Sequence, residues 1–224
     1  MNRLALIALA LVGVSSPSAA QYVSDAEPFL TAVKERDGNK ATELVNSRPS
    51  LVNTRNVKGE TALNVVIARS DDNWTRFLIG KGANVNLAAT NGDTPLITAA
   101  RVGFTDGIDL LLQLGAKVDA TNRMGETALI LAVQQRRLDA VKLLLAKGAD
   151  PDKKDAAAGY SARDYAKRDT RNPQILAAIE AAGQKTPATP IKLPAEPART
   201  GILTLEALII SRRSAAAWRH SSRM

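Results

Sequence analysis

The sequence contains no cysteine and only one histidine, His220, which lies close to its end. Without cysteine the chain has no disulfide, no thiolate metal ligand and no thiol nucleophile. His220 has no acidic residue near it in the sequence, and the region expected to fold contains no histidine for a serine–histidine–aspartate triad. We therefore expect a protein that is not an enzyme, with no catalytic residues, no metal site and no cofactor, whose stability depends on packing.

Apolar stretches are also short, since none reaches the roughly 20 residues that a membrane-spanning helix needs. The apolar run 4–14 follows Arg3 and precedes the small residues Ser-Ser-Pro-Ser-Ala-Ala. This order is typical of a secretory signal peptide with cleavage between Ala20 and Gln21. The alternative is an N-terminal membrane anchor, for which the run is too short. We expect residues 1–20 to be removed and the mature protein to be soluble, exported, and periplasmic or secreted.

The formal net charge of +8 does not belong mainly to the region expected to fold. Residues 184–224 contribute +5 and Arg3 contributes +1, which leaves +2 for residues 21–183. A nucleic-acid-binding domain needs a basic face of its own. We expect no nucleic-acid partner.

What the sequence does contain is a short motif of glycine, an acidic residue, threonine and leucine that returns at a fixed interval. The interval is 33 residues between the first three leading glycines and 34 residues to the fourth. The recurring positions are Gly59, Gly92, Gly125 and Gly159; Thr61, Thr94 and Thr127; and the pairs Gly82-Ala83, Gly115-Ala116 and Gly148-Ala149. Self-similarity at this period predicts a repeat architecture.

The residue pattern of each unit predicts two helices. In the third unit, Thr94 can cap a helix and Pro95 suits its first turn. Gly103 ends this helix, and a second one follows with apolar residues at helical spacing and a stop at Gly115. Neither helix can bury its apolar side alone, so neighbouring units must stack.

This pattern, "GDTPLITAA…LLLQLGAKVDA", resembles the ankyrin repeat, which has a β-hairpin loop and two antiparallel helices in 33 residues. The resemblance implies an all-α solenoid of about five helix-turn-helix units with short β-hairpin loops. The domain would span residues 21–183, with a longer opening repeat and a degenerate last one in which Ser161 replaces threonine. The expected repeats are about 25–58, 59–91, 92–124, 125–158 and 159–183.

Some positions depart from the pattern of that family. Asn64, Ile97 and Ile130 stand where the family usually has histidine, and we expect the two isoleucines to replace its polar contacts by packing. Trp74 stands where the other units have a small residue. We expect it to pack in the core, with exposure as the alternative.

The repeated carboxylates Glu60, Asp93 and Glu126 allow two interpretations. A cation or acid–base site is the first, but stacked units would hold the carboxylates too far apart to share an ion or a proton. We favour the second, a favourable interaction with the N-terminal end of each helix dipole. The leading glycines are a full repeat apart, so they do not form a phosphate-binding loop, and we expect them to supply a positive φ in each hairpin.

The residues that differ between repeats, on a frame that persists, predict a binding surface along the hairpin tips and the concave face. The alternative is a plain solvated surface. The apolar tips Val57 and Met124 suit a contact patch, and Arg69, Arg101 and Arg123 suit an acidic partner. We expect a monomer that binds another exported protein, in the envelope or secreted. The candidate contact residues are Val57, Lys58, Arg69, Thr90, Asn91, Arg101, Arg123, Met124, Gln134 and Gln135.

A second hypothesis places the contact in the C-terminal part of the chain. Residues 184–200 form a Pro-rich linker, and residues 201–224 form a basic tail that we expect to be disordered. Within the tail, the apolar run 202–210 followed by arginines suits the surface of an anionic membrane. The alternative function is then a structural or assembly role in the cell envelope.

Overall fold

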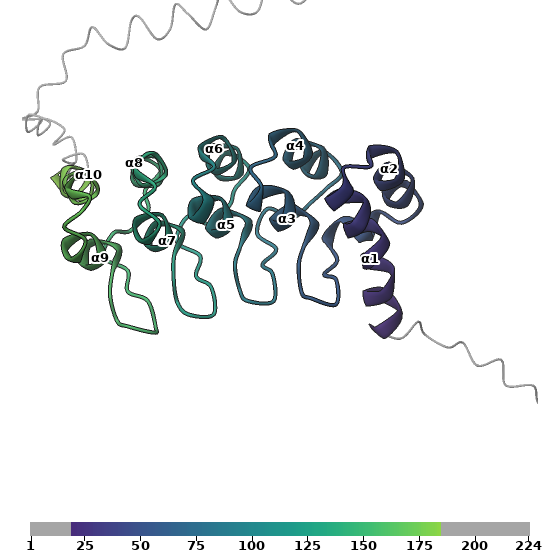
Figure 1. The fold of residues 1–224 in the computed structure, drawn as a ribbon, viewed down its shortest axis with the longest axis horizontal. Coiled ribbons are helices and arrows are strands. Elements are labelled where there is room, and N and C mark those ends of the chain that lie inside the picture. Colours follow the sequence, from purple (N-terminus) through teal and green to yellow (C-terminus); the bar gives the residue numbers. More distant parts are fainter. Residues whose placement is uncertain (1–18, 185–224) are drawn as a thin grey trace, which may run out of the picture. The chain divides into compact units, whose positions relative to one another are not determined.

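The computed structural model describes residues 19–184 (Figure 1). The predicted signal peptide up to residue 18, and the predicted linker and tail from residue 185 onward, lie outside these residues. Within the described range the chain forms ten α-helices and one 3₁₀ turn. They are α1 (Ala19–Glu35), α2 (Gly38–Ser47), η1 (Pro49–Asn53), α3 (Ala62–Ala68), α4 (Asp72–Gly80), α5 (Pro95–Val102), α6 (Thr105–Gln113), α7 (Ala128–Gln134), α8 (Leu138–Ala146), α9 (Ala162–Arg168) and α10 (Pro173–Gln184).

The helices form five consecutive pairs that stack in two layers. Figure 1 shows the odd-numbered helices in one layer and the even-numbered helices in the other, with the loops between repeats projecting from the odd-numbered layer. Each odd-numbered helix packs against its own partner and against the odd-numbered helix of the next repeat. This arrangement confirms the predicted all-α solenoid. We call the side with the projecting loops the hairpin side.

Threonine begins each of the three central pairs, as predicted. The side-chain oxygens of Thr61, Thr94 and Thr127 accept hydrogen bonds from the backbone N–H three residues later, at 3.2–3.3 Å. Ser161 does the same in the last repeat, and Asp164 returns the bond to the serine N–H. Each such cap stabilises the helix by about 1 kcal/mol relative to alanine.

The ends of the first helices are less uniform than their beginnings. Gly103 ends α5 with φ of 79°, in the left-handed region that glycine adopts without strain. Arg36, Ser70 and Arg136 occupy the corresponding turns with φ of 62°, 54° and 55°. A side chain in this conformation costs roughly 1–2 kcal/mol, so three of the repeats carry backbone strain that the third repeat avoids.

The unusual residues at the histidine position are buried, as expected. Ile97 and Ile130 are fully enclosed and replace polar contacts by packing. Asn64 keeps one polar contact, because its amide Nδ2 donates to the carbonyl oxygen of Asp93 in the next repeat at 2.8 Å.

Aromatic side chains pack differently in neighbouring repeats. Trp74 is half-buried and packs edge-on against Phe77, with ring centroids 5.1 Å apart. This confirms packing over full exposure. In the next repeat the same position is Gly107, where a Cβ atom would lie 2.3 Å from the ring of Phe104. Gly107 therefore makes room for a phenylalanine that enters from the preceding turn.

No helix within residues 19–184 has the length and hydropathy of a membrane-spanning segment.

Candidate binding surface

The connections between repeats are tight hairpins, as predicted. Isolated antiparallel bridges close three of the four hairpins, and the second one in chain order closes through a bond from the Ala89 N–H to the Asp93 carbonyl at 2.9 Å. The bridges join Arg55 to Thr61, Thr121 to Thr127, and Lys154 to Ser161. The leading glycines have φ between 70° and 85°, which confirms their expected conformation.

Neighbouring hairpins are also bonded to one another. The backbone N–H groups of Thr90, Arg123 and Ala156 each donate to a carbonyl oxygen of the preceding hairpin, at 2.9, 3.3 and 2.9 Å. A Cβ atom on Gly92 would lie 2.5 Å from the backbone nitrogen of Arg123. The glycine is therefore required for the close approach of two hairpins as well as for its φ. The tips form one connected row.

The carboxylate of Asp93 is at the centre of a polar cluster between two hairpins. Its side chain is only 3% exposed. One oxygen accepts from the Asn91 amide at 2.6 Å and from the Arg101 guanidinium at 2.7 Å, and the other accepts from the Asn122 amide at 3.1 Å. These bonds tie the second hairpin to its own helix and to the third hairpin. The sequence predicted only a helix-dipole role for this residue.

The other two repeated carboxylates make similar ties. Glu60 accepts from Asn56 at 2.9 Å and from the Lys34 ammonium at 2.7 Å. The Lys34 bond is the main reason why the pKa of Glu60 is lowered, against the opposing effect of burial. Glu126 accepts from Asn122 at 2.8 Å.

Asparagine side chains organise these hairpins, and sequence reasoning missed them. The Oδ1 atoms of Asn56 and Asn122 each accept two backbone N–H groups of their own loop. In the third repeat this position is Ala89, and Asn91 takes over by accepting the Asp93 N–H at 3.0 Å. An Asn or Asp three or four residues before three of the four leading glycines was the available signal, and the third repeat, with Ala89, interrupts it.

The last hairpin uses Asp155 in the same place. Its carboxylate accepts from the backbone of Ala158 and Gly159 and from the hydroxyl of Tyr165, the last at 2.6 Å. Burial acts to raise the pKa of Asp155, but the bond from Tyr165 and those from the backbone outweigh it, so this pKa is lowered. For the same reason the pKa of Tyr165 is raised, chiefly by its bond to Asp155.

The structure separates the predicted contact residues into two groups. Seven are exposed, and six of these belong to the hairpin tips. The exposed residues are Val57, Lys58, Thr90, Asn91, Arg123, Met124 and Gln135, and the half-buried ones are Arg69, Arg101 and Gln134.

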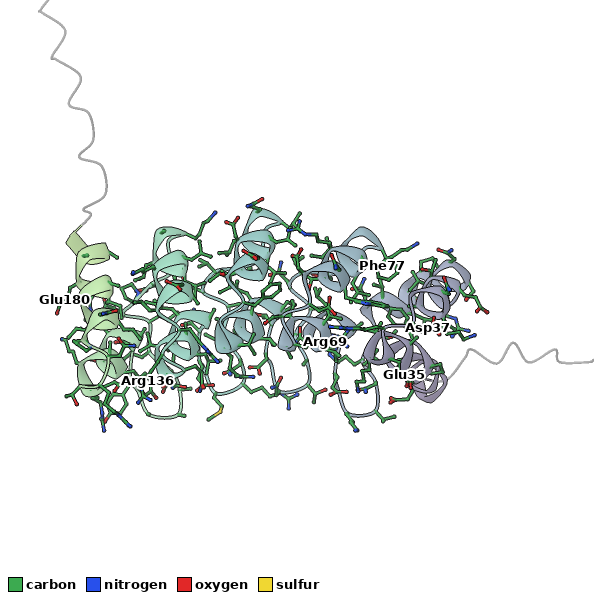
Figure 2. The ribbon with its side chains drawn as sticks, turned by 45° about the horizontal axis from the view of Figure 1, so that its top comes forward. Glu35, Asp37, Arg69, Phe77, Arg136 and Glu180 are labelled. Atoms are coloured by element: carbon green, nitrogen blue, oxygen red, sulfur yellow. The ribbon has the colours of Figure 1, made fainter. Side chains whose placement is uncertain are left out.

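Two of the three predicted arginines already have partners inside the array. Arg69 donates to the carbonyl oxygens of Val33 and Lys34 at 2.9 and 3.1 Å, and it pairs with Asp71. In Figure 2 it lies between the first two repeats. Arg101 pairs with the buried Asp93. Both arginines therefore have structural roles that the sequence did not predict, while Arg123 remains an exposed tip residue.

Within the described residues, no group of three or more His, Asp or Glu side chains is placed to hold a metal ion. The carboxylates on the hairpin side are instead occupied by amides and cations of the array.

Comparison with protein families agrees with this geometry. The family model for ankyrin repeats (3 copies) matches residues 29–122 and 76–155, which together cover more than half of the chain. No curated protein matches the sequence. With helix pairs, hairpins and repeat length all in the same register, the chain belongs to the ankyrin repeat family.

Proposed function

We propose that this protein is a non-catalytic interaction module that binds another exported protein along its row of hairpin tips. Ankyrin repeats in general mediate protein–protein binding. The observation that carries the proposal is the placement of exposed apolar side chains. Among the described residues, three large hydrophobic side chains are exposed, and two of them, Val57 and Met124, lie at hairpin tips with exposures of 71% and 54%.

These two side chains stand on a surface that is held in place. The backbone bonds between hairpins and the cluster around Asp93 fix the loops on which they lie. A preorganised loop loses little conformational entropy when a partner binds. Removal of the exposed apolar surface from water then contributes on the order of 1 kcal/mol per side chain.

The cellular setting of the proposal rests on the sequence. The arrangement of residues 1–20 supports export, so the partner would be a periplasmic, envelope or secreted protein, bound by a monomer. The alternative role of residues 201–224 at a membrane surface concerns a segment outside the described residues.

Site-specific photocrosslinking tests the proposal. A photoreactive amino acid at position 57 or 124 should give a discrete crosslinked product in cells, because both positions would face the partner. The matched control is position 142 on α8, where Lys142 is exposed in the other layer. If position 142 gives the same product as positions 57 and 124, or if the tip positions give none, the tip row is not the binding surface.

A further inference from the structure

A cluster of arginines lies between the last two repeats on the array. Arg136, Arg168 and Arg171 line a shallow cavity of about 290 Å³ together with Asp169. Val133, Gln134 and Tyr165 form the rest of its lining. We call this the arginine notch. Figure 2 shows Arg136 near the C-terminal end of the array, away from Phe77 in the opposite layer.

The notch has a single carboxylate, Asp169, and it pairs with two of the three arginines. Arg136 pairs with Asp169 at 2.6 Å, and Arg171 lies 3.9 Å from the same side chain. The bond to Arg136 is the main reason why the pKa of Asp169 is lowered. Arg171 is 79% exposed and Arg136 is 44% exposed, so both remain accessible to an anion.

The third cation is held without using its hydrogen-bond donors. The Arg168 guanidinium lies over the ring of Tyr160, 4.5 Å from the centroid. Within the described residues this is its only recorded interaction. A guanidinium carries five N–H donors in a plane that matches a carboxylate. Arg168 therefore presents an oriented group that lacks an acceptor.

The corresponding cavity two repeats earlier has the opposite charge balance. It measures about 280 Å³ and lies between α3 and α5. Two carboxylates, Glu60 and Asp93, line it with a single arginine, Arg101, that is bonded to Asp93. The excess of cations in the notch is therefore not a property of every repeat junction.

We propose that the arginine notch binds an acidic segment of the partner protein, through the carboxylates of Glu or Asp side chains. This inference rests on the proposed function, since it states the chemistry of one part of that partner. Paired guanidinium–carboxylate bonds are strong and directional. The small cavity suits one or two carboxylate side chains, and the nearly balanced charge of residues 21–183 offers no extended basic track for a nucleic acid.

The test uses the full chain and a fluorescent peptide of alternating glutamate and serine, with the glutamine counterpart as reference. We expect the glutamate peptide to bind more tightly, and the Arg168→Ala/Arg171→Ala variant to weaken it about tenfold or more, since bonds to charged groups are lost. The control, Arg76→Ala/Lys142→Ala, removes the same charge from exposed positions on α4 and α8 and should leave binding within about twofold. Equal effects of the two double variants would overturn the proposal and assign the peptide to general attraction.

A second variant reverses the expected direction. Asp169→Asn removes the only carboxylate of the notch, so it should tighten glutamate-peptide binding severalfold, provided that thermal melting shows an intact array. Unchanged or weaker binding would overturn the proposal. A single-stranded oligonucleotide that binds more tightly than the glutamate peptide and displaces it would also overturn the proposal. That result would indicate a nucleic-acid ligand. Crosslinking from positions 57 and 124 is read separately, so the notch can fail while the tip row stands.

Discussion

Replacement of Asp93 by asparagine perturbs the centre of the polar cluster between the second and third hairpins. The carboxylate accepts bonds at 2.6, 2.7 and 3.1 Å from Asn91, Arg101 and Asn122. An amide at this position has only one acceptor atom, and its NH₂ group would face a donor from a neighbouring side chain. The variant therefore keeps the shape of the residue and removes its ability to accept all three bonds.

The expected loss of stability follows from burial. A hydrogen bond to a charged group contributes about 1.5–3 kcal/mol. A fully buried ion pair that loses one partner costs about 3–5 kcal/mol. Arg101 is 38% exposed, so water can solvate it after the change, and the lower range applies. We expect Asp93→Asn to reduce the free energy of unfolding by about 2–3 kcal/mol.

A double-mutant cycle identifies the contact that is responsible. Arg101→Gln alone should cost about 1–2 kcal/mol, and it should cost much less in the Asp93→Asn background, with a coupling energy near 1 kcal/mol. Urea unfolding at neutral pH, followed by circular dichroism and by tryptophan fluorescence, gives the four values. Two probes are needed because a repeat array can unfold in parts. The control is Glu180→Gln on the exposed surface of α10, which should change stability by less than about 0.5 kcal/mol.

Two results would refute this reasoning. One is an Asp93→Asn variant as stable as the wild type, and the other is fully additive effects of the two substitutions.

The ion pair between Asp93 and Arg101 also matters for the design of binding experiments. Arg101→Glu would place a second carboxylate beside Asp93, so a loss of binding in that variant would not identify Arg101 as a contact residue.

Three further predictions concern the loops and turns. In urea titrations, Ser70→Gly should raise the free energy of unfolding by about 0.5–1 kcal/mol, because it relieves the backbone strain of a serine in the left-handed region. Gly103→Ala should lower the free energy of unfolding by at least as much. A loss of stability in Ser70→Gly would contradict the strain at this position. Gly92→Ala should cost about 2 kcal/mol or more in thermal melting, since its Cβ would meet the Arg123 backbone, while alanine at Gly38, which has open space, should cost far less. Tyr165→Phe should destabilise the array at neutral pH. The difference in free energy of unfolding between this variant and the wild type should become smaller below about pH 4. The sign follows because the folded-state pKa of Asp155 is lowered: its contribution is present above the unfolded pKa and is lost as pH falls through the folded one. If the difference in free energy of unfolding stays constant with pH, stability does not depend on the protonation of Asp155 in this way.

Sequence reasoning was most accurate where structure depends on neighbouring backbone. Thr94 and Pro95 begin α5 as predicted, because a cap needs only an acceptor side chain and an N–H three residues later. The burial of Ile97 and Ile130 followed from their place in the repeat, where an apolar residue replaces the histidine that is usual in the family. The same reasoning did not find Arg36, Ser70 and Arg136 in left-handed turns, because nothing in those residue types indicates the conformation that packing imposes on them.

The repeat period, the helix starts, the glycine turns and the packed isoleucines were determined by the sequence itself, since each depends on local backbone preference or on spacing along one helix. Which polar side chains remain available to a partner depends on contacts between stacked repeats. Arg69 meets a carbonyl 36 residues away, Asn122 meets Asp93 across 29 residues, and Arg136 meets Asp169 across 33. A polar residue at a fixed place in a repeat looks exposed when its own unit is considered alone. Its actual partner lies one repeat away, at a distance that stacking alone establishes.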